Sequence, residues 1–135
     1  MLFGQEHTDR YKETDGDVGH DWQGTQVLLL TTTGRKTGEE RELPLIYGTN
    51  GDDYLIVASK GGADEPPAWY LNLKADPNVV VQVKGDRFDA QAREASPEEK
   101  ADLWSTMTAE WPAYDDYQSK TERDIPVVLL EAPGA

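Results

Sequence analysis

The chain reads Val27-Leu28-Leu29-Leu30-Thr31-Thr32-Thr33-Gly34-Arg35-Lys36-Thr37-Gly38 near its start, and this stretch decides the fold. Its apolar and β-branched beginning is long enough for a buried strand over 27–33. The glycines and charges that follow predict a turn, with 41–48 as the returning strand. An Asn50-Gly51 pair then predicts a tight hairpin turn into a third strand over 54–59. We therefore expect this part of the chain to form an antiparallel meander.

The rest of the chain alternates short strands with helices. Ser96-Pro97-Glu98-Glu99 carries the residues of a capping box, and the helix that it starts is expected to bury Leu103, Trp104 and Met107. The other expected elements are helices over 68–74 and around 114–117, and strands over 79–84, 87–94 and 125–130. Six strands with inserted helices predict a mostly β fold, a small and mainly antiparallel barrel.

Length and composition indicate one compact domain. The chain has 135 residues, of which 37% are hydrophobic, enough for a single core. We expect a cofactor-binding domain over 25–135, preceded by a polar arm or short helix over 1–24. The absence of cysteine and of any apolar run near the roughly 20 residues of a membrane span favours a cytoplasmic protein without stable membrane insertion.

Charge is unevenly distributed along the sequence. Acidic residues outnumber basic ones by 26 to 13, which gives a net charge of −13 and argues against nucleic acid as a partner. Yet two glycine-containing turns, 34–38 and 59–62, and their flanks carry four cations: Arg35, Lys36, Arg41 and Lys60. The first turn alone could be a solubilising hairpin tip. Together the two turns indicate a specific anionic ligand, held by cations and by backbone amides exposed at Gly61-Gly62.

Other kinds of site find little support in the sequence. The only histidines are His7 and His20, and neither has a partner at the spacing of metal ligands, so no metal site is expected. No Gly-x-Ser-x-Gly or Gly-x-Gly-x-x-Gly motif is present, which argues against a serine hydrolase and a nicotinamide-binding Rossmann unit.

Several blocks in this order resemble the deazaflavin-dependent nitroreductase and quinone reductase family of actinobacteria. The resemblance runs from about residue 13 to residue 131. The matching blocks are 28–38, Arg41 with Pro44-Leu45, 57–63, 67–73, 77–79, 81–83, Trp111-Pro112, Tyr114, Tyr117-Gln118 and 121–126. The resemblance implies a split β-barrel of the flavin reductase and pyridoxamine oxidase type. It also implies the reduced 8-hydroxy-5-deazaflavin, coenzyme F420, as cofactor.

The resemblance further implies which residues form the site. The cofactor-binding residues would be Arg35, Lys36, Thr37, Arg41, Pro44, Leu45, Ile46, Val57, Ala58, Ser59, Lys60, Gly61, Ala68, Trp69 and Asn72. The walls of the substrate pocket would be Trp111, Tyr114 and Tyr117. The hydroxyls available to protonate a reduced substrate are those of Tyr114, Tyr117 and Ser59, and water could serve equally.

The expected function is that of an oxidoreductase. It would transfer a hydride from the reduced deazaflavin to a small-molecule acceptor: a quinone, an enone or lactone-fused aromatic, or a nitro compound. Ile46 and Trp111 stand where other family members carry tyrosine, which puts nitroimidazole reduction in doubt. Two alternatives stay open, a non-catalytic deazaflavin carrier and a split-barrel binder of flavin mononucleotide or haem. The oligomeric state, a monomer or a weak homodimer, also stays open.

Overall fold

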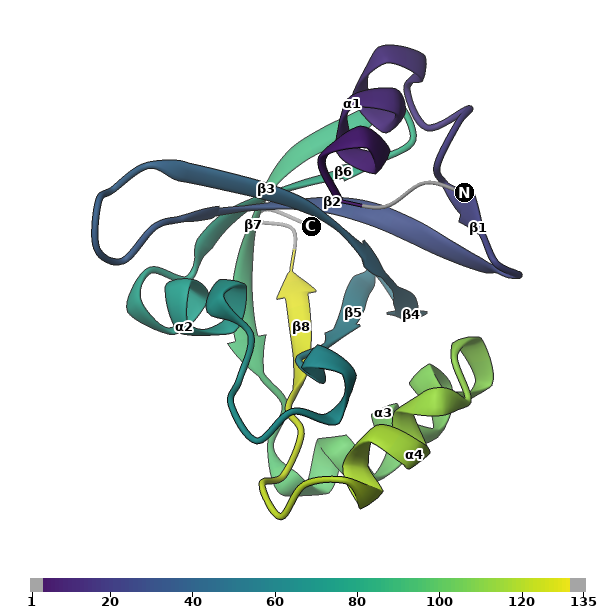
Figure 1. Ribbon diagram of the computed structural model, residues 1–135, viewed down its shortest axis with the longest axis vertical. Helices are drawn as coiled ribbons and strands as arrows, with labels where there is room; N and C mark the ends of the chain where they lie inside the picture. The colour runs from purple at the N-terminus through teal and green to yellow at the C-terminus, as the bar shows by residue number, and fades with distance from the viewer. Residues whose placement is uncertain (1–3, 132–135) are drawn as a thin grey trace.

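One antiparallel sheet curls around the core of the protein in the computed structural model, which describes residues 4–131 (Figure 1). Its strand order is β1-β2-β6-β7-β8-β5-β4, and β3 pairs with β2 beside this path. The strands are β1 (Asp21–Trp22), β2 (Thr25–Thr33), β3 (Glu40–Ile46), β4 (Gly48–Asn50), β5 (Asp53–Val57), β6 (Asn78–Val83), β7 (Asp86–Glu94) and β8 (Val127–Glu131). The helices are α1 (Gly4–Thr14), α2 (Ala68–Ala75), α3 (Pro97–Glu110) and α4 (Ala113–Ser119), with a 3-10 turn, η1 (Lys60–Gly62).

The barrel is split between β3 and β5. β3 pairs along its whole length with β2, from Glu40 opposite Thr33 to Ile46 opposite Val27. β5 pairs with β4 and β8 instead, and no strand ladder within residues 4–131 joins it to β3. The outer edge of β3 therefore faces an opening in the barrel. This architecture confirms the expected antiparallel split barrel, with β1 and β4 as two short strands beyond the six that the sequence predicts.

The prediction of one returning strand over 41–48 is wrong, because the chain breaks at Tyr47. The amide of Tyr47 donates to the carbonyl of Gln26 at 3.1 Å, and its ring is buried. Its hydroxyl lies 2.8 Å from Nε2 of His20. These contacts anchor Tyr47 beside β2. Beyond it β4 and β5 form a hairpin of their own around Gly51, and the meander does not continue from β3 to β5. The turn itself lies where Asn50-Gly51 places it.

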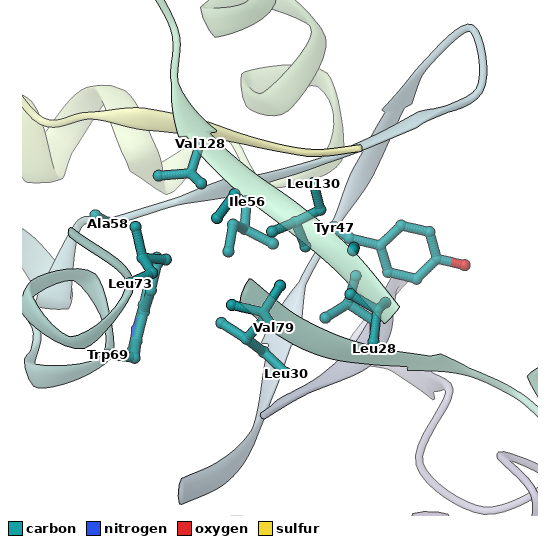
Figure 2. Packing of buried hydrophobic residues seen from close by; sticks show 13 residues of the cluster. Leu28, Leu30, Tyr47, Ile56, Ala58, Trp69, Leu73, Val79, Val128 and Leu130 are labelled. Carbon is teal, nitrogen blue, oxygen red and sulfur yellow. The ribbon is translucent and has the colours of Figure 1, made fainter. Parts of the chain in front are cut away.

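The core fills the inside of the curled sheet. Leu28 and Leu30 of β2 meet Ile56 of β5 and Val128 of β8, all fully buried, and α2 closes one end with Trp69 (Figure 2). Figure 2 also shows the Tyr47 hydroxyl pointing away from this cluster. Burial of such side chains supplies most of the favourable free energy of folding.

A second cluster joins α3 and α4 to the sheet. The predicted capping box starts α3: Oγ of Ser96 accepts from the amide of Glu99 at 3.2 Å, and the Ser96 amide donates to the Glu99 carboxylate at 2.9 Å. Leu103 and Met107 are buried as expected. Trp104, in contrast to the expectation, is only partly buried, and its Nε1 donates to Asp115 of α4 at 2.7 Å. None of the helices formed by residues 4–131 is long and apolar enough to cross a bilayer.

Candidate active site

Two neighbouring cavities open along the split in the barrel, and Lys60 lines both. We call the first the apolar cavity; its volume is about 350 Å³. One wall is the edge of β3, residues 44–46, and another is Val57 with the loop residues 59–61. Trp111, Tyr114 and Tyr117, at the end of α3 and in α4, form a third side. The fourth side comes from the N-terminal segment: Gly4, His7, Trp22 and Val27.

The second, the cationic cavity, has a volume of about 620 Å³. The turn after β2 contributes residues 34–37, β3 contributes residues 41–43, and Lys60 stands at the border with the apolar cavity. The start of α2 contributes residues 67–69 and Asn72. All four cations that the sequence singles out therefore lie around one cavity, although 19 positions separate Arg41 from Lys60.

Arg35 is held in place by α2. Oδ1 of Asn72 accepts from Nη1 of Arg35 at 2.8 Å and from its amide at 3.2 Å. Nδ2 of Asn72 donates in turn to Oγ1 of Thr32 at 3.3 Å, and both Asn72 and Thr32 are buried. A buried amide with its polar groups bonded in this way is costly to remove, so Asn72 fixes the guanidinium at the wall of the cavity.

Within residues 4–131 the other three cations have weak partners or none. Nη2 of Arg41 lies 3.4 Å from Glu39, and Nζ of Lys60 lies 3.9 Å from Glu65, with more than half of each of these four side chains exposed. Such exposed pairs contribute little to stability, so a bound anion could displace them. The site thus combines one fixed cation with adjustable ones, although the protein as a whole is strongly acidic.

The loop that carries Lys60 has an unusual backbone. Lys60, Gly61 and Gly62 all have positive φ angles, of 47°, 65° and 87°. The guanidinium of Arg123 donates to the carbonyls of Ala58, Ser59 and Ala63 at 3.2, 3.0 and 2.9 Å, and so ties both ends of the loop together. Arg123 is not among the residues expected at the site.

One expectation about this loop is wrong. The amides of Gly62 and Ala63 donate to the carbonyls of Ser59 and Lys60, at 2.9 and 3.2 Å. Gly61-Gly62 therefore does not expose two consecutive amides to an anion. Positive charge in the site comes from side chains.

The three expected proton donors all line the apolar cavity, but they differ in hydrogen bonding and in burial. The Tyr117 hydroxyl accepts from Nε1 of Trp111 at 3.4 Å, and the Tyr114 hydroxyl has no hydrogen-bond partner within residues 4–131. Burial, with a smaller effect of neighbouring Tyr117, raises the pKa of Tyr114 well above the usual 10.0. Tyr114 therefore stays protonated and can donate a hydrogen bond, but it releases its proton less readily than an ordinary tyrosine. Ser59 is buried at the inner wall.

The outer edge of β3 adds backbone groups to the site. In an antiparallel pair every second residue turns its N–H and C=O away from the neighbouring strand. Since β3 has β2 on one side and no ladder on the other within the described part of the chain, such groups point toward the opening. A flat, polar-edged ligand could bond to them while its faces lie against apolar side chains.

The structure brings together all but one of the residues expected at the site. Ala58 is the exception: it is fully buried in the core, its amide donates to the Pro126 carbonyl, and it lines neither cavity. Four residues of the apolar cavity were not foreseen: Gly4, His7, Trp22 and Val27. The signal for two of them was in the sequence, because His7 and Trp22 are large rings in an otherwise polar arm. Gly34, Glu42, Leu43 and Pro67 of the cationic cavity were not among the expected site residues either. Among the described residues, no group of three or more histidine or acidic side chains could hold a metal ion.

Comparison with known proteins connects this geometry to a family. Residues 3–132 match the model of the F420H(2)-dependent quinone reductase family. An F420H(2)-dependent quinone reductase of Mycobacterium tuberculosis is 44% identical over 128 residues, which cover 92% of this chain and 86% of the relative.

Solved structures agree with the sequence match. An F420-H2-dependent reductase is 42% identical, with a TM-score of 0.73, over 78% of this chain and 93% of the other. A domain-swapped dimer is 40% identical, with a TM-score of 0.76, over 94% and 96% of the two chains. The haem storage protein HutZ of Vibrio cholerae, 16% identical, has a TM-score of 0.65 over 94% and 90% of the two chains, which shows a shared fold alone.

Proposed function

Because the chain belongs to the F420H(2)-dependent quinone reductase family, an oxidoreductase family whose coenzyme is F420, we propose that its two cavities hold the two halves of that coenzyme. The phosphate and glutamate tail would lie in the cationic cavity, and the deazaflavin ring would lie in the apolar one. The observation that carries this proposal is that Lys60 lines both cavities, so that one extended ligand could occupy them together.

The cationic cavity fits the tail in charge. Arg35, Arg41, Lys36 and Lys60 supply four positive charges, and guanidinium groups can bind phosphate or carboxylate with two parallel hydrogen bonds. Arg35 is positioned before any ligand arrives, because Asn72 fixes it. A preorganised cation loses less conformational freedom on binding, which strengthens the complex.

The apolar cavity fits a flat ring. Pro44, Leu45 and Ile46 present side chains and the open strand edge on one side, and Val57 closes another. Trp111 and Tyr117 stand at the α3–α4 side, where they would hold an aromatic acceptor against the ring and exclude water. When bound, the reduced coenzyme supplies the hydride. The protein's contribution is then to align the two rings, and proximity of this kind accounts for much of a rate enhancement.

Polar groups of the apolar cavity would stabilise the acceptor after reduction. A quinone that has taken up a hydride carries negative charge on oxygen and needs a hydrogen bond or a proton. The Tyr114 hydroxyl is available as a donor, and its raised pKa makes it a hydrogen-bond donor rather than an acid. Ser59 and Tyr117 are the other hydroxyls within the same walls.

We also propose a wider range of hydride acceptors and a location for the reaction. Enones, lactone-fused aromatics and nitro compounds are further acceptors that the cavity could take, and we place the reaction in the cytoplasm. The proposal covers a monomer or a weak homodimer, and one solved relative is a domain-swapped dimer. A non-catalytic carrier would need the four cations but no aromatic wall such as Trp111, Tyr114 and Tyr117 form. Flavin mononucleotide, with a single phosphate, would leave cations without partners.

A titration followed by a turnover assay tests the proposal. The purified protein is titrated with coenzyme F420 and with flavin mononucleotide, each followed by fluorescence, and the oxidation of reduced F420 is then measured with the soluble quinone menadione. We expect tight binding of F420, weak binding of flavin mononucleotide, and oxidation that depends on both protein and quinone. Binding without oxidation by any quinone, enone or nitro acceptor would identify a carrier instead. Tighter binding of flavin mononucleotide would exclude the assignment of the two cavities.

A further inference from the structure

His7 is a buried histidine on the wall of the apolar cavity. It projects from α1, a helix with a polar sequence that lies over β3 (Figure 1), and its exposed fraction is only 3%. Its ring lies 6.0 Å from that of Trp22, which lies 6.0 Å from that of Trp111. The three rings form a continuous wall from α1 to the end of α3. His7 has no role in the proposed binding of the coenzyme.

The hydrogen bond of His7 fixes which nitrogen can exchange a proton. Nε2 lies 2.8 Å from the carbonyl oxygen of Gly19. A carbonyl only accepts, so Nε2 carries its hydrogen in both the neutral and the charged ring, and Nδ1 is the nitrogen that gains and loses a proton. Nδ1 has no partner within residues 4–131. Among the described residues, no side-chain nitrogen or oxygen atom is both fully buried and without a hydrogen bond. Nδ1 is therefore accessible to solvent, and the His7 ring lines the apolar cavity.

The fold makes room for this ring at Gly19. A Cβ atom at that position would lie 2.9 Å from Cδ2 and 3.1 Å from Nε2 of His7, and the φ angle of Gly19 is +108°. Only glycine combines this backbone conformation with so close an approach. The loop before β1 is thus shaped to bond one edge of the imidazole while the other edge stays open.

An imidazolium is a better proton donor to a reduced quinone than the nearby tyrosine hydroxyls. The other titratable side chains of the described wall are Lys60, Tyr114 and Tyr117. A hydroquinone anion is a phenolate, whose proton affinity is close to that of an ordinary tyrosinate, with a pKa near ~10. Proton transfer from Tyr114, whose pKa burial raises, would be uphill. Imidazole is the side chain that ordinarily titrates near neutral pH, so transfer from an imidazolium to a phenolate is downhill.

We propose that His7 is a catalytic residue of quinone reduction, with Nδ1 as the donor of the proton that completes the hydroquinone. This rests on the proposed function. The hydride brings both electrons to the quinone and leaves a hydroquinone anion. The Nδ1–H bond of the imidazolium then breaks as the O–H bond of the product forms. His7 is left neutral with Nε2 still donating to Gly19, and it takes its next proton from water at the mouth of the cavity.

Substitution by glutamine separates this role from a structural one. In His7→Gln the side-chain amide can still donate to the Gly19 carbonyl, but nothing titrates. We expect the thermal midpoint and the affinity for F420 to stay near those of the wild type. The kcat with menadione at neutral pH should fall about 10²-fold, and its decline with rising pH should weaken. The matched control is His20→Gln, which removes the other histidine, bonded to Tyr47 and Asp21 outside both cavities, and should keep the pH profile.

Nuclear magnetic resonance on the wild-type protein gives an answer that does not depend on turnover or on the stability of a variant. The chain has only two histidines, so their ¹⁵N signals are readily assigned. With oxidised F420 bound, addition of 1-naphthol, a redox-inert stand-in for the hydroquinone, should shift Nδ1 of His7 and leave His20 unchanged. A wild-type rate and pH profile in His7→Gln, or a His7 signal that 1-naphthol does not move, would overturn the proposal. A wild-type protein that oxidises no quinone would instead refute the proposed function.

Discussion

At the scale of single residues, Asn72 decides how well the cationic cavity is preorganised. Asn72→Ala removes both contacts to Arg35 and the donor to buried Thr32. We expect the free energy of unfolding to fall by about 1–3 kcal/mol, and F420 to bind more weakly because Arg35 is no longer fixed. Denaturant titration and fluorescence binding measure the two effects. Asn78→Ala is the control: it also removes side-chain hydrogen bonds, outside both cavities, and should leave F420 affinity unchanged. Equal affinities in the two variants would contradict the role of Asn72.

Tyr114 tests the substrate side of the apolar cavity. Because its pKa is raised by burial, we expect Tyr114→Phe to remove a hydrogen bond to the reduced acceptor rather than an acid. Hydrogen bonds to charged groups contribute about 1.5–3 kcal/mol, so kcat with menadione should fall by about 10- to 10²-fold while F420 affinity is nearly unchanged. Tyr54→Phe, a tyrosine that packs between Tyr47 and Phe88, is the control. Undiminished turnover in Tyr114→Phe would remove Tyr114 from the reaction.

Tyr117→Phe is the parallel test. The Tyr117 hydroxyl accepts from Nε1 of Trp111, which leaves its own hydrogen able to bond to a reduced acceptor. Turnover with menadione should therefore fall as in Tyr114→Phe, and an unchanged kcat would remove Tyr117 from the reaction.

The sequence indicated most of the residues that line the two cavities, but not the hydrogen bonds between them. The basic turns, the Ser59–Gly61 loop and the aromatic group at 111–117 could be found from sequence, and the structure gathers them around two adjoining cavities. The bonds of Asn72 to Arg35, and of Arg123 to the 58–63 loop, join segments about 40 to 65 positions apart. Propensities and periodicities describe neighbours along the chain, so they carry no information on such pairs.

At the scale of elements, the packing of η1 on α4 links the two cavities. A Cβ atom on Gly62 would lie 2.7 Å from the Tyr117 carbonyl oxygen and 2.9 Å from its Cα, whereas nothing lies within 4 Å of one on Gly61. Both glycines have positive φ, so alanine strains the backbone by about 1–2 kcal/mol at either position. Gly62→Ala should cost clearly more than Gly61→Ala in thermal stability and should also lower turnover by moving α4. Equal losses of stability would contradict this packing.

The break between β3 and β4 gives the protein a dependence on alkaline pH. Burial, followed by the negative charges of nearby groups, raises the pKa of Tyr47 from 10.0 to about 12. The folded state therefore holds this proton more tightly than the unfolded state. The stabilisation is complete below pH 10 and is lost as the pH rises through about 12.

Denaturant titrations between pH 9 and 12 test this dependence. Tyr47→Phe should lower stability at neutral pH, because Nε2 of His20 loses its hydrogen-bond partner, and should flatten the decline above pH 10. A residual decline should remain, since burial also raises the pKa values of Tyr11 and Tyr114. A variant that declines as steeply as the wild type would show that Tyr47 does not titrate as described.

Element boundaries followed from local patterns except where a distant contact intervened. The capping box at Ser96 and the turn at Asn50-Gly51 depend on neighbouring residues alone, and both lie where the sequence predicts them. The break at Tyr47 depends on His20, which lies 27 positions away. A continuous strand was the natural reading of 41–48, because nothing within that stretch interrupts it.

At the scale of the whole molecule, an acidic protein concentrates cations at one opening, where we propose that the acidic coenzyme binds. The net charge of −13 repels anions at a distance, while Arg35, Lys36, Arg41 and Lys60 attract them at contact. The net charge follows from composition alone, and the two basic turns indicated the local cluster of cations. The two turns meet at the split in the barrel only because of the way the sheet closes. Local sequence patterns do not predict that closure.

The most direct test compares full-length F420 with the deazaflavin nucleoside that lacks its phosphate and glutamate tail. Both are titrated by fluorescence against the wild type, against Arg41→Ala/Lys60→Ala, and against Arg10→Ala/Lys100→Ala, whose cations lie outside both cavities. The wild type and the control pair should bind F420 at least about 10-fold more tightly than the nucleoside, with an advantage that shrinks as salt is added. In Arg41→Ala/Lys60→Ala this advantage should largely disappear while nucleoside binding persists. An advantage that survives the loss of both cations would contradict the assignment of the tail to the cationic cavity.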